Sequence, residues 1–279
     1  MNTTLKTLAL AALLLPGIAS AEMSQEEIAK ASQNPLTAMY SLPIQNNTYV
    51  NIGPDDKTKN IANFQPVLPF DLNDDWTVVT RTIVPIVSNP SLPGLTPNPN
   101  DTYERTFGLG DTTFTAFFTP KAATESGWIW GVGPTLYLPT ATDTDLGTKK
   151  WGAGASAVAL KMDGKFVYGG LISNVWSFAG SGQDAGIERV NAMTFQPFIN
   201  YNMDDGWFVA SVPIITANWE AIDNDHTWTV PMGLGVGKAM KLGKIPMTAQ
   251  VHGYYNVVTP DDYGEEWQMR VQIQLLFPR

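Results

Sequence analysis

The clearest pattern in the chain is a strict alternation of apolar and polar residues in segment 267–277. Its odd positions are all apolar, from Trp267 to Phe277, and its even positions up to 274 are Gln or Arg. Alternation with a period of two predicts a β-strand with one apolar and one polar face. A half-buried strand of a soluble β-sandwich would show the same pattern. Aromatic residues at both ends and a length of about ten residues favour a tilted membrane-spanning strand. Such a sheet must close on itself, so we expect the last strand to pair with the first.

The connections between β-like segments alternate in length from Ala38 onward. Short turns are expected at 71–75, 121–126, 162–165, 202–206 and 240–244. Longer loops are expected at 51–60, 88–110, 139–150, 179–190, 220–226 and 258–265. Bacterial outer-membrane barrels have an even strand number, tight periplasmic turns and longer extracellular loops. We therefore predict an all-β fold over residues 38–279, a closed antiparallel transmembrane β-barrel of about 12 strands with both ends on the short-turn side.

Aromatic residues lie where the strands are expected to leave the membrane. Amphipathic rings favour the two membrane interfaces. The core of a soluble domain would explain their number but not their placement at strand ends. The residues that we assign to the two aromatic girdles are Trp76, Trp128, Phe166 and Trp207 beside short turns, and Trp151, Trp176, Trp219, Trp228 and Trp267 beside long loops.

The polar positions of the same segments are expected to face the lumen and to line the path of a solute. These residues are Gln45, Asn47, Tyr49, Asn63, Gln65, Arg81, Gln196, Asn200, Gln250, His252, Tyr254, Asn256, Arg270 and Gln272. A lumen rich in amides and Tyr suits small polar or aromatic solutes. The alternative is that these side chains bond to one another across a lumen that conducts nothing. Barrels of eight strands are filled by side chains and those of sixteen leave a channel, so about twelve strands allow both outcomes.

Small and cyclic residues interrupt several of these segments. Gly233, Gly235 and Gly237 share one face, which leaves a smooth inner wall or room for a packed group. Proline cannot donate to a strand ladder and argues against a central strand. Four prolines lie at a similar distance from a short turn, and we expect them to form a belt of β-bulges that narrows the lumen. They are Pro66, Pro134, Pro197 and Pro213.

The N-terminal region has two expected parts. Residues 1–21 have the features of a cleaved signal peptide, with Lys6, an apolar run at 8–15 and a small-residue cleavage site at 19–21. Residues 22–37 form an expected periplasmic segment that could be a helical plug. Ser24 followed by Glu27 has the spacing of a helix capping box. The alternative for this segment is a disordered leader. Either it or the Pro-rich loop 88–110 could close the lumen.

Composition narrows the chemistry. Charged residues make up 15% of the chain and the formal net charge is −9, with no Cys. A soluble domain has about a quarter charged residues, and absent Cys excludes thiol chemistry. The sequence has no cluster of basic residues, so nucleic acid is not an expected partner. Outer-membrane phospholipases place a His two residues before a Ser. Neither His226 nor His252 has a Ser at that spacing. We therefore predict no enzymatic activity, no catalytic residues, no metal site and no cofactor.

Several motifs resemble a known family. They are Asn34-Pro35 and the segments at 41–47, 63–70, 72–76, 196–198, 217–221 and 276–279. Together they resemble a family of bacterial outer-membrane proteins labelled as transporters, often mislabelled neuromedin U, which is related to phenol meta-pathway type outer-membrane proteins. The resemblance implies a barrel in the outer membrane of a Gram-negative bacterium, and it brings no catalytic residues. We expect outer-membrane lipid and lipopolysaccharide, the barrel-assembly machinery and a small solute as partners. The expected function is a channel for passive movement of small polar or aromatic solutes. The alternative is a non-conducting structural or ligand-binding barrel.

Overall fold

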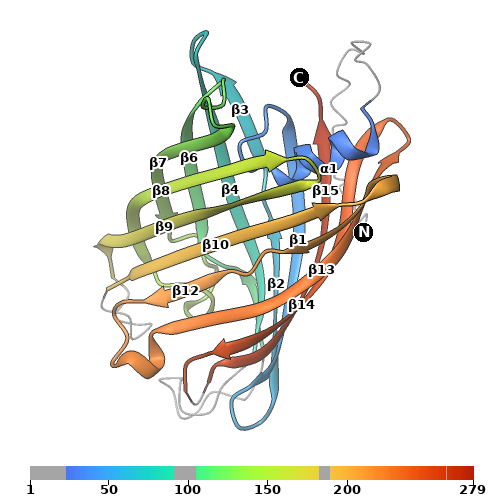
Figure 1. Ribbon diagram of the computed structural model, residues 1–279. Helices are drawn as coiled ribbons and strands as arrows, with labels where there is room; N and C mark the ends of the chain where they lie inside the picture. Colours follow the sequence, from blue (N-terminus) through green and yellow to red (C-terminus); the bar gives the residue numbers. More distant parts are fainter. Residues whose placement is uncertain (1–22, 91–104, 182–188, 262) are drawn as a thin grey trace, which may run out of the picture.

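The chain forms one antiparallel sheet that closes into a barrel (Figure 1). The computed structural model describes residues 23–90, 105–181, 189–261 and 263–279. The predicted signal peptide and most of the Pro-rich loop lie outside these residues. The strands are β1 (Tyr40–Ile52), β2 (Lys57–Phe64), β3 (Val67–Asp71), β4 (Trp76–Asn89), β5 (Thr106–Leu109), β6 (Thr112–Pro120), β7 (Trp128–Leu138), β8 (Lys150–Asp163), β9 (Phe166–Gly180), β10 (Asn191–Asn202), β11 (Trp207–Ser211), β12 (Ile215–Asn218), β13 (Trp228–Leu242), β14 (Ile245–Val258) and β15 (Glu265–Phe277).

Twelve strands make up the wall, because three of them are each divided into two pieces. The pieces β2 and β3 both pair with β1 and β4, and the pieces β11 and β12 both pair with β10 and β13. The pieces β5 and β6 both pair with β4, and β6 also pairs with β7. The predicted alternation of short turns and longer loops is confirmed with one exception. Only residues 53–56 separate β1 from β2, so the expected loop at 51–60 is a tight turn.

The first and last strands close the barrel as expected. Strand β1 pairs antiparallel with β15, from Tyr40 opposite Phe277 to Ile52 opposite Glu265. The twelve-stranded wall then has no free edge strand, so the backbone groups that lipid cannot hydrogen-bond are satisfied by neighbouring strands. The open edges of a soluble sandwich are therefore absent from the described strands.

Side chains alternate across the wall. In β15, Trp267, Met269, Val271 and Ile273 are exposed on the outer surface, whereas Gln268, Arg270 and Gln274 are buried inside. The outward apolar residues form a lipid-facing surface. Seven of the aromatic residues assigned to the girdles are exposed, namely Trp128, Trp151, Phe166, Trp176, Trp207, Trp219 and Trp267. Trp76 and Trp228 are half-buried against Trp130 and Trp219. Their role as interface belts stays a prediction.

The prediction of bulges at the four prolines is wrong. Pro66 and Pro213 lie in the gaps between β2 and β3 and between β11 and β12, while Pro134 and Pro197 lie inside β7 and β10. The register is the same on both sides of each interruption, whereas a bulge would shift it. Proline here removes a hydrogen-bond donor without adding a residue to the strand. Register shifts occur instead near the long-loop ends of β1, β8 and β13.

A short helix lies at the short-turn end of the barrel (Figure 1). Helix α1 (Gln25–Gln33) begins at Ser24, which forms the predicted capping box with Glu27. Ile28 and Ala29 are fully buried against the inner surface of β11, β13 and β15. Short 3-10 helices η1 (Thr144–Leu146), η3 (Asp204–Gly206) and η4 (Asn224–His226) lie in the connections. Among the described residues, no helix is long and apolar enough to cross a membrane.

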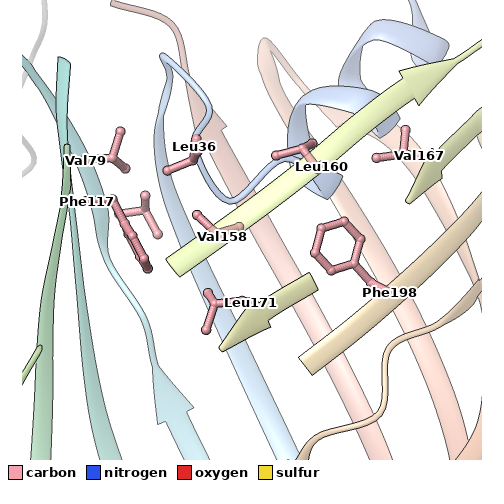
Figure 2. Packing of buried hydrophobic residues seen from close by; sticks show 9 residues of the cluster. Leu36, Val79, Phe117, Val158, Leu160, Val167, Leu171 and Phe198 are labelled. Carbon is pink, nitrogen blue, oxygen red and sulfur yellow. The ribbon is translucent and has the colours of Figure 1, made fainter. Parts of the chain in front are cut away.

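The chain after α1 continues the filling of this end. Figure 2 shows Leu36 among buried apolar side chains that come from several strands. These side chains are Val79 of β4, Phe117 of β6, Val158 and Leu160 of β8, Val167 and Leu171 of β9, and Phe198 of β10, joined by Val67 of β3. We call these residues the apolar cluster. The inside of the barrel is therefore a packed hydrophobic core near the short turns.

Candidate functional site

A cavity of about 130 Å³ lies inside the barrel next to the apolar cluster. Residues 32–35, at the end of α1 and just after it, form one side of the cavity. Nine of the residues predicted to line the solute path also line this cavity. They are Gln45, Gln65, Arg81, Gln196, Asn200, Gln250, His252, Arg270 and Gln272. We call this space the lumen cavity.

The other five predicted residues do not line the cavity. Asn47, Tyr254 and Asn256 are buried, and Tyr49 and Asn63 are half-buried. Asn256 Nδ2 donates to the backbone carbonyl of Glu265 at 2.6 Å. These residues belong to the inner wall but do not enclose the open volume.

Asn47 is the centre of a buried hydrogen-bond network. Its Oδ1 accepts from Gln45 Nε2 at 3.2 Å, from Gln268 Nε2 at 3.0 Å and from Arg270 Nε at 3.0 Å. Arg270 also donates from Nη1 to the Val212 carbonyl at 2.8 Å. Strands β1 and β15 are thus joined by side chains as well as by their backbones.

The guanidinium of Arg270 is buried without a carboxylate partner. The side chain is 2% exposed and stands over the Tyr254 ring, with Cζ 5.0 Å from the ring centroid. Among the described residues, Nη2 has no hydrogen-bond partner. An unsatisfied charged donor in the interior is costly, so this nitrogen marks a position that favours an acceptor.

A second guanidinium belongs to Arg81 of β4. Its Nη2 donates to Oε1 of Gln65, and the residue is half-buried because it faces the cavity. Arg81 and Arg270 line the same cavity. Neither forms an ion pair with a described residue. The cavity therefore has a positive side.

His252 connects the cavity wall to Tyr254. The Tyr254 hydroxyl lies 3.0 Å from His252 Nδ1, and His252 Nε2 lies 3.0 Å from Gln250 Oε1. The two rings are stacked with an interplanar angle of 7°. This arrangement uses both ring nitrogens within the wall.

The three glycines of β13 leave room for packed groups, since an added Cβ at Gly235 would meet the His252 ring and one at Gly237 would meet Phe208.

The apolar lining of the cavity was not predicted from the sequence. Val67, Leu171, Phe198, Phe208 and Val212 line it together with the polar residues. Strand parity could have placed the first four on the inner face, because each alternates with outward residues. An apolar residue on the inner face looks the same in the sequence whether it lines an open volume or fills a packed core, so only the polar positions were predicted to line the solute path.

The outer connections hold local polar clusters. Asp223 accepts from His226 and from the backbone nitrogens of Asp225 and His226, and these bonds hold the pKa of its carboxyl below the usual value. Asp111 accepts from Tyr137, Ala141 and Thr148 and so anchors the connection between β7 and β8. Among the described residues, no group of three or more His, Cys, Asp or Glu could hold a metal ion.

Comparisons with known proteins identify the fold. No family model and no curated protein matches the chain. An outer membrane channel from Pseudomonas putida F1 is similar over 87% of this chain and 97% of that chain, with a TM-score of 0.61 and 18% identity. Outer membrane phospholipase A from Escherichia coli is similar over 90% of this chain and 97% of that chain, with a TM-score of 0.47 and 12% identity. A Pseudomonas aeruginosa FadL homologue is similar over 89% of this chain and 92% of that chain, with a TM-score of 0.41 and 9% identity.

The closed sheet and its lipid-facing surface define the class of protein. The chain is a transmembrane β-barrel of the kind found in the outer membrane of Gram-negative bacteria. The prediction that the chain is not an enzyme is corrected, because an enzyme, outer membrane phospholipase A, is among the proteins to which the chain is similar. A barrel wall can carry reactive groups on either face, so the absence of a His-x-Ser motif does not exclude catalysis. At 12% identity the comparison assigns no reaction to this chain.

Proposed function

We propose that the chain is an outer-membrane channel for passive movement of small polar or aromatic solutes. The observation that carries this proposal is the lumen cavity, which is enclosed by Gln, Asn, Arg and His side chains inside a closed barrel. Polar groups that line a pore set selectivity by replacing the hydration of the solute. The similar channel from Pseudomonas putida F1 supports the same function.

A non-conducting barrel is the second candidate, and the filling of the short-turn end favours it. Residues 22–37 are the proposed plug, since Ile28 and Leu36 both pack among buried side chains of the wall. Gln33 and Asn202 also exchange two amide hydrogen bonds, at 2.9 and 3.0 Å. In this candidate the cavity binds a ligand but does not pass it on.

The remaining parts of the proposal concern location and assembly. Residues 1–21 act as a cleaved signal peptide, and the barrel comprises residues 38–279. Its partners are outer-membrane lipid, lipopolysaccharide and the barrel-assembly machinery. Kinship with the transporter-labelled family is part of the same proposal. The assigned girdle aromatics would hold the barrel at the two interfaces.

Single-channel conductance in planar bilayers tests the proposal. The refolded barrel is first checked by its heat-dependent shift on a gel. Discrete current steps support the channel, and any ion preference that arises from the charge of −9 on the chain should weaken in high salt. A folded barrel without current steps rejects it in favour of the non-conducting candidate.

Deletion of residues 22–37 separates an open lumen from a plugged one. Removing Ile28 and Leu36 takes away apolar groups that fill the short-turn end, so conductance is expected to rise. The matched control is Lys30→Ala, which removes an exposed Lys30–Glu26 ion pair and leaves the packed face of α1 intact. Equal conductance in all three proteins would contradict a plugging role.

A further inference from the structure

The lumen cavity combines a buried cation, Arg270, with a half-buried one, Arg81. Arg81 and Arg270 both line it, and none of the described residues that line it is Asp or Glu. The buried acid Asp111 accepts hydrogen bonds from Tyr137, Ala141 and Thr148 and does not line the cavity, so it does not neutralise either arginine. Burial of a charge is costly unless a partner of opposite sign compensates it. The positive charge in the cavity is therefore uncompensated, and a bound anion would compensate it.

Amides of the protein satisfy only part of the two guanidinium groups. Arg81 donates to Gln65, and Arg270 donates to Asn47 and to the carbonyl of Val212. These acceptors are neutral, and Arg270 Nη2 is left without a partner among the described residues. The planar fork of an arginine matches the two oxygens of a carboxylate, and such charge-assisted bonds are stronger than neutral ones.

Apolar residues also line the cavity. Leu171, Phe198, Phe208 and Val212 contribute apolar surface next to the arginines. The volume of about 130 Å³ is close to that of an engineered cavity of about 150 Å³ that binds benzene. A ligand with one charged end and a compact apolar body would satisfy both sides. A bare inorganic anion would leave the apolar side without contacts.

We propose that the lumen cavity binds a small organic carboxylate, with its carboxylate against Arg81 and Arg270 and its apolar body against Leu171 and Phe198. The proposal deepens the proposed channel function, and it rests on that function for the claim that the bound solute passes through. Acidic residues in the outer connections, such as Asp223 and Asp261, do not oppose the site. They lie outside the cavity and act on entry.

Calorimetric titration of the refolded full barrel in detergent tests the proposal with benzoate at neutral pH. Benzamide is the neutral isostere, and sodium chloride is the source of a small inorganic anion. Benzoate is expected to bind more tightly than benzamide by about tenfold or more, since hydrogen bonds to charged groups contribute about 1.5–3 kcal/mol. Chloride is expected to compete weakly.

Substitutions identify the groups responsible. Arg81→Gln is expected to weaken benzoate binding by about tenfold or more and to leave benzamide binding unchanged. Gln65→Glu keeps the size of the side chain and supplies Arg81 with a carboxylate from the protein itself, so it is expected to weaken benzoate binding as well. Arg189→Gln is the matched control, because Arg189 is exposed and pairs with Glu220 on the outer surface.

The outcomes separate this proposal from the channel function. Equal binding of benzoate and benzamide, absence of benzoate binding, or equal loss in Arg81→Gln and Arg189→Gln would overturn it. If chloride binds as tightly as benzoate, the claim that the ligand needs an apolar organic body is overturned. If Arg81→Gln fails the heat-shift test for folding, Gln65→Glu decides the result. A barrel that binds benzoate but carries no current keeps the proposal and rejects the channel, whereas a conducting barrel that binds no benzoate does the reverse.

Discussion

The short-turn end and the centre of the barrel interior are built in different ways. Near the short turns, Leu36 joins the apolar cluster and Ile28 packs against the wall, as in the core of a soluble protein. In the centre, amide and guanidinium groups bond to one another around a cavity. Apolar packing fills space without regard to direction, whereas hydrogen bonds fix direction and leave volume between the groups. The difference indicates that one region maintains the shape and the other has room for a ligand.

Truncation in the apolar cluster is expected to have the largest effect on stability. Phe117→Ala should lower the free energy of unfolding by about 3–5 kcal/mol, because the ring is 1% exposed and its removal leaves a cavity. Phe118→Ala is the control on the same strand, since Phe118 points to lipid and is 40% exposed. Denaturant unfolding in detergent micelles measures both. Equal losses would contradict a packed core inside the barrel.

The polar network is tested by removing its shared acceptor. Asn47→Ala leaves Gln45, Gln268 and Arg270 without one acceptor, and an unsatisfied buried group costs about 1–3 kcal/mol. Asn47→Asp keeps an oxygen acceptor and adds a counter-charge for Arg270, so a smaller loss is expected. If both variants unfold at the same denaturant concentration as the original chain, the network contributes nothing to stability.

A pair of amides joins the helical segment to the wall. Gln33→Ala removes both hydrogen bonds with Asn202 and is expected to cost about 1 kcal/mol of docking free energy. Faster proteolysis of the N-terminal segment is the measurement. A double-mutant cycle with Asn202→Ala should show coupling between the two positions. Additive effects would mean that the helix docks through its apolar face alone.

The smallest expected effect concerns pH. Hydrogen bonds with the Ser24 backbone and hydroxyl hold the pKa of Glu27 below the usual value. A lowered pKa in the folded state stabilises the capping box above the unfolded pKa, and this contribution is lost as the pH falls through the folded value. Docking of α1 should therefore weaken in acid. Glu27→Gln should show less dependence on pH over the same acidic range, as measured by proteolysis with an acid-active protease.

The strand pattern of this fold was readable from the sequence because lipid outside and a lumen inside impose a period of two. Trp267 to Phe277 shows that pattern directly, and the alternation of turns gave the strand number. The tight turn at 53–56 was missed, since Gly53 and Asp56, which have positive φ and form the turn, were counted as residues of a longer loop. The effect of the prolines on the strands was also predicted wrongly. A proline that only removes a hydrogen-bond donor from the ladder cannot be distinguished in the sequence from a proline at a bulge, where the strand has an extra residue.

The candidate site was predictable only on its polar side. Parity places Gln45 and Arg270 on the inner face, but the open volume depends on which side chains bond to each other. Asn47 and Tyr254 have the right parity and yet support the wall. The contribution of residues 32–35 depends on how α1 docks, which arises from contacts between distant parts of the chain and not from a local pattern.

The seam between β1 and β15 has a consequence for how the barrel can form. Asn47 bonds to Arg270, 223 residues further along the chain, and the backbone ladder of the two strands joins the same distant segments. Closure must wait until both segments are available, and contacts of such long separation are slow to form. Until then the sheet has two free edges that can pair with other chains. A chain that lacks β15 should therefore accumulate as aggregates, because β1 would have no permanent neighbour.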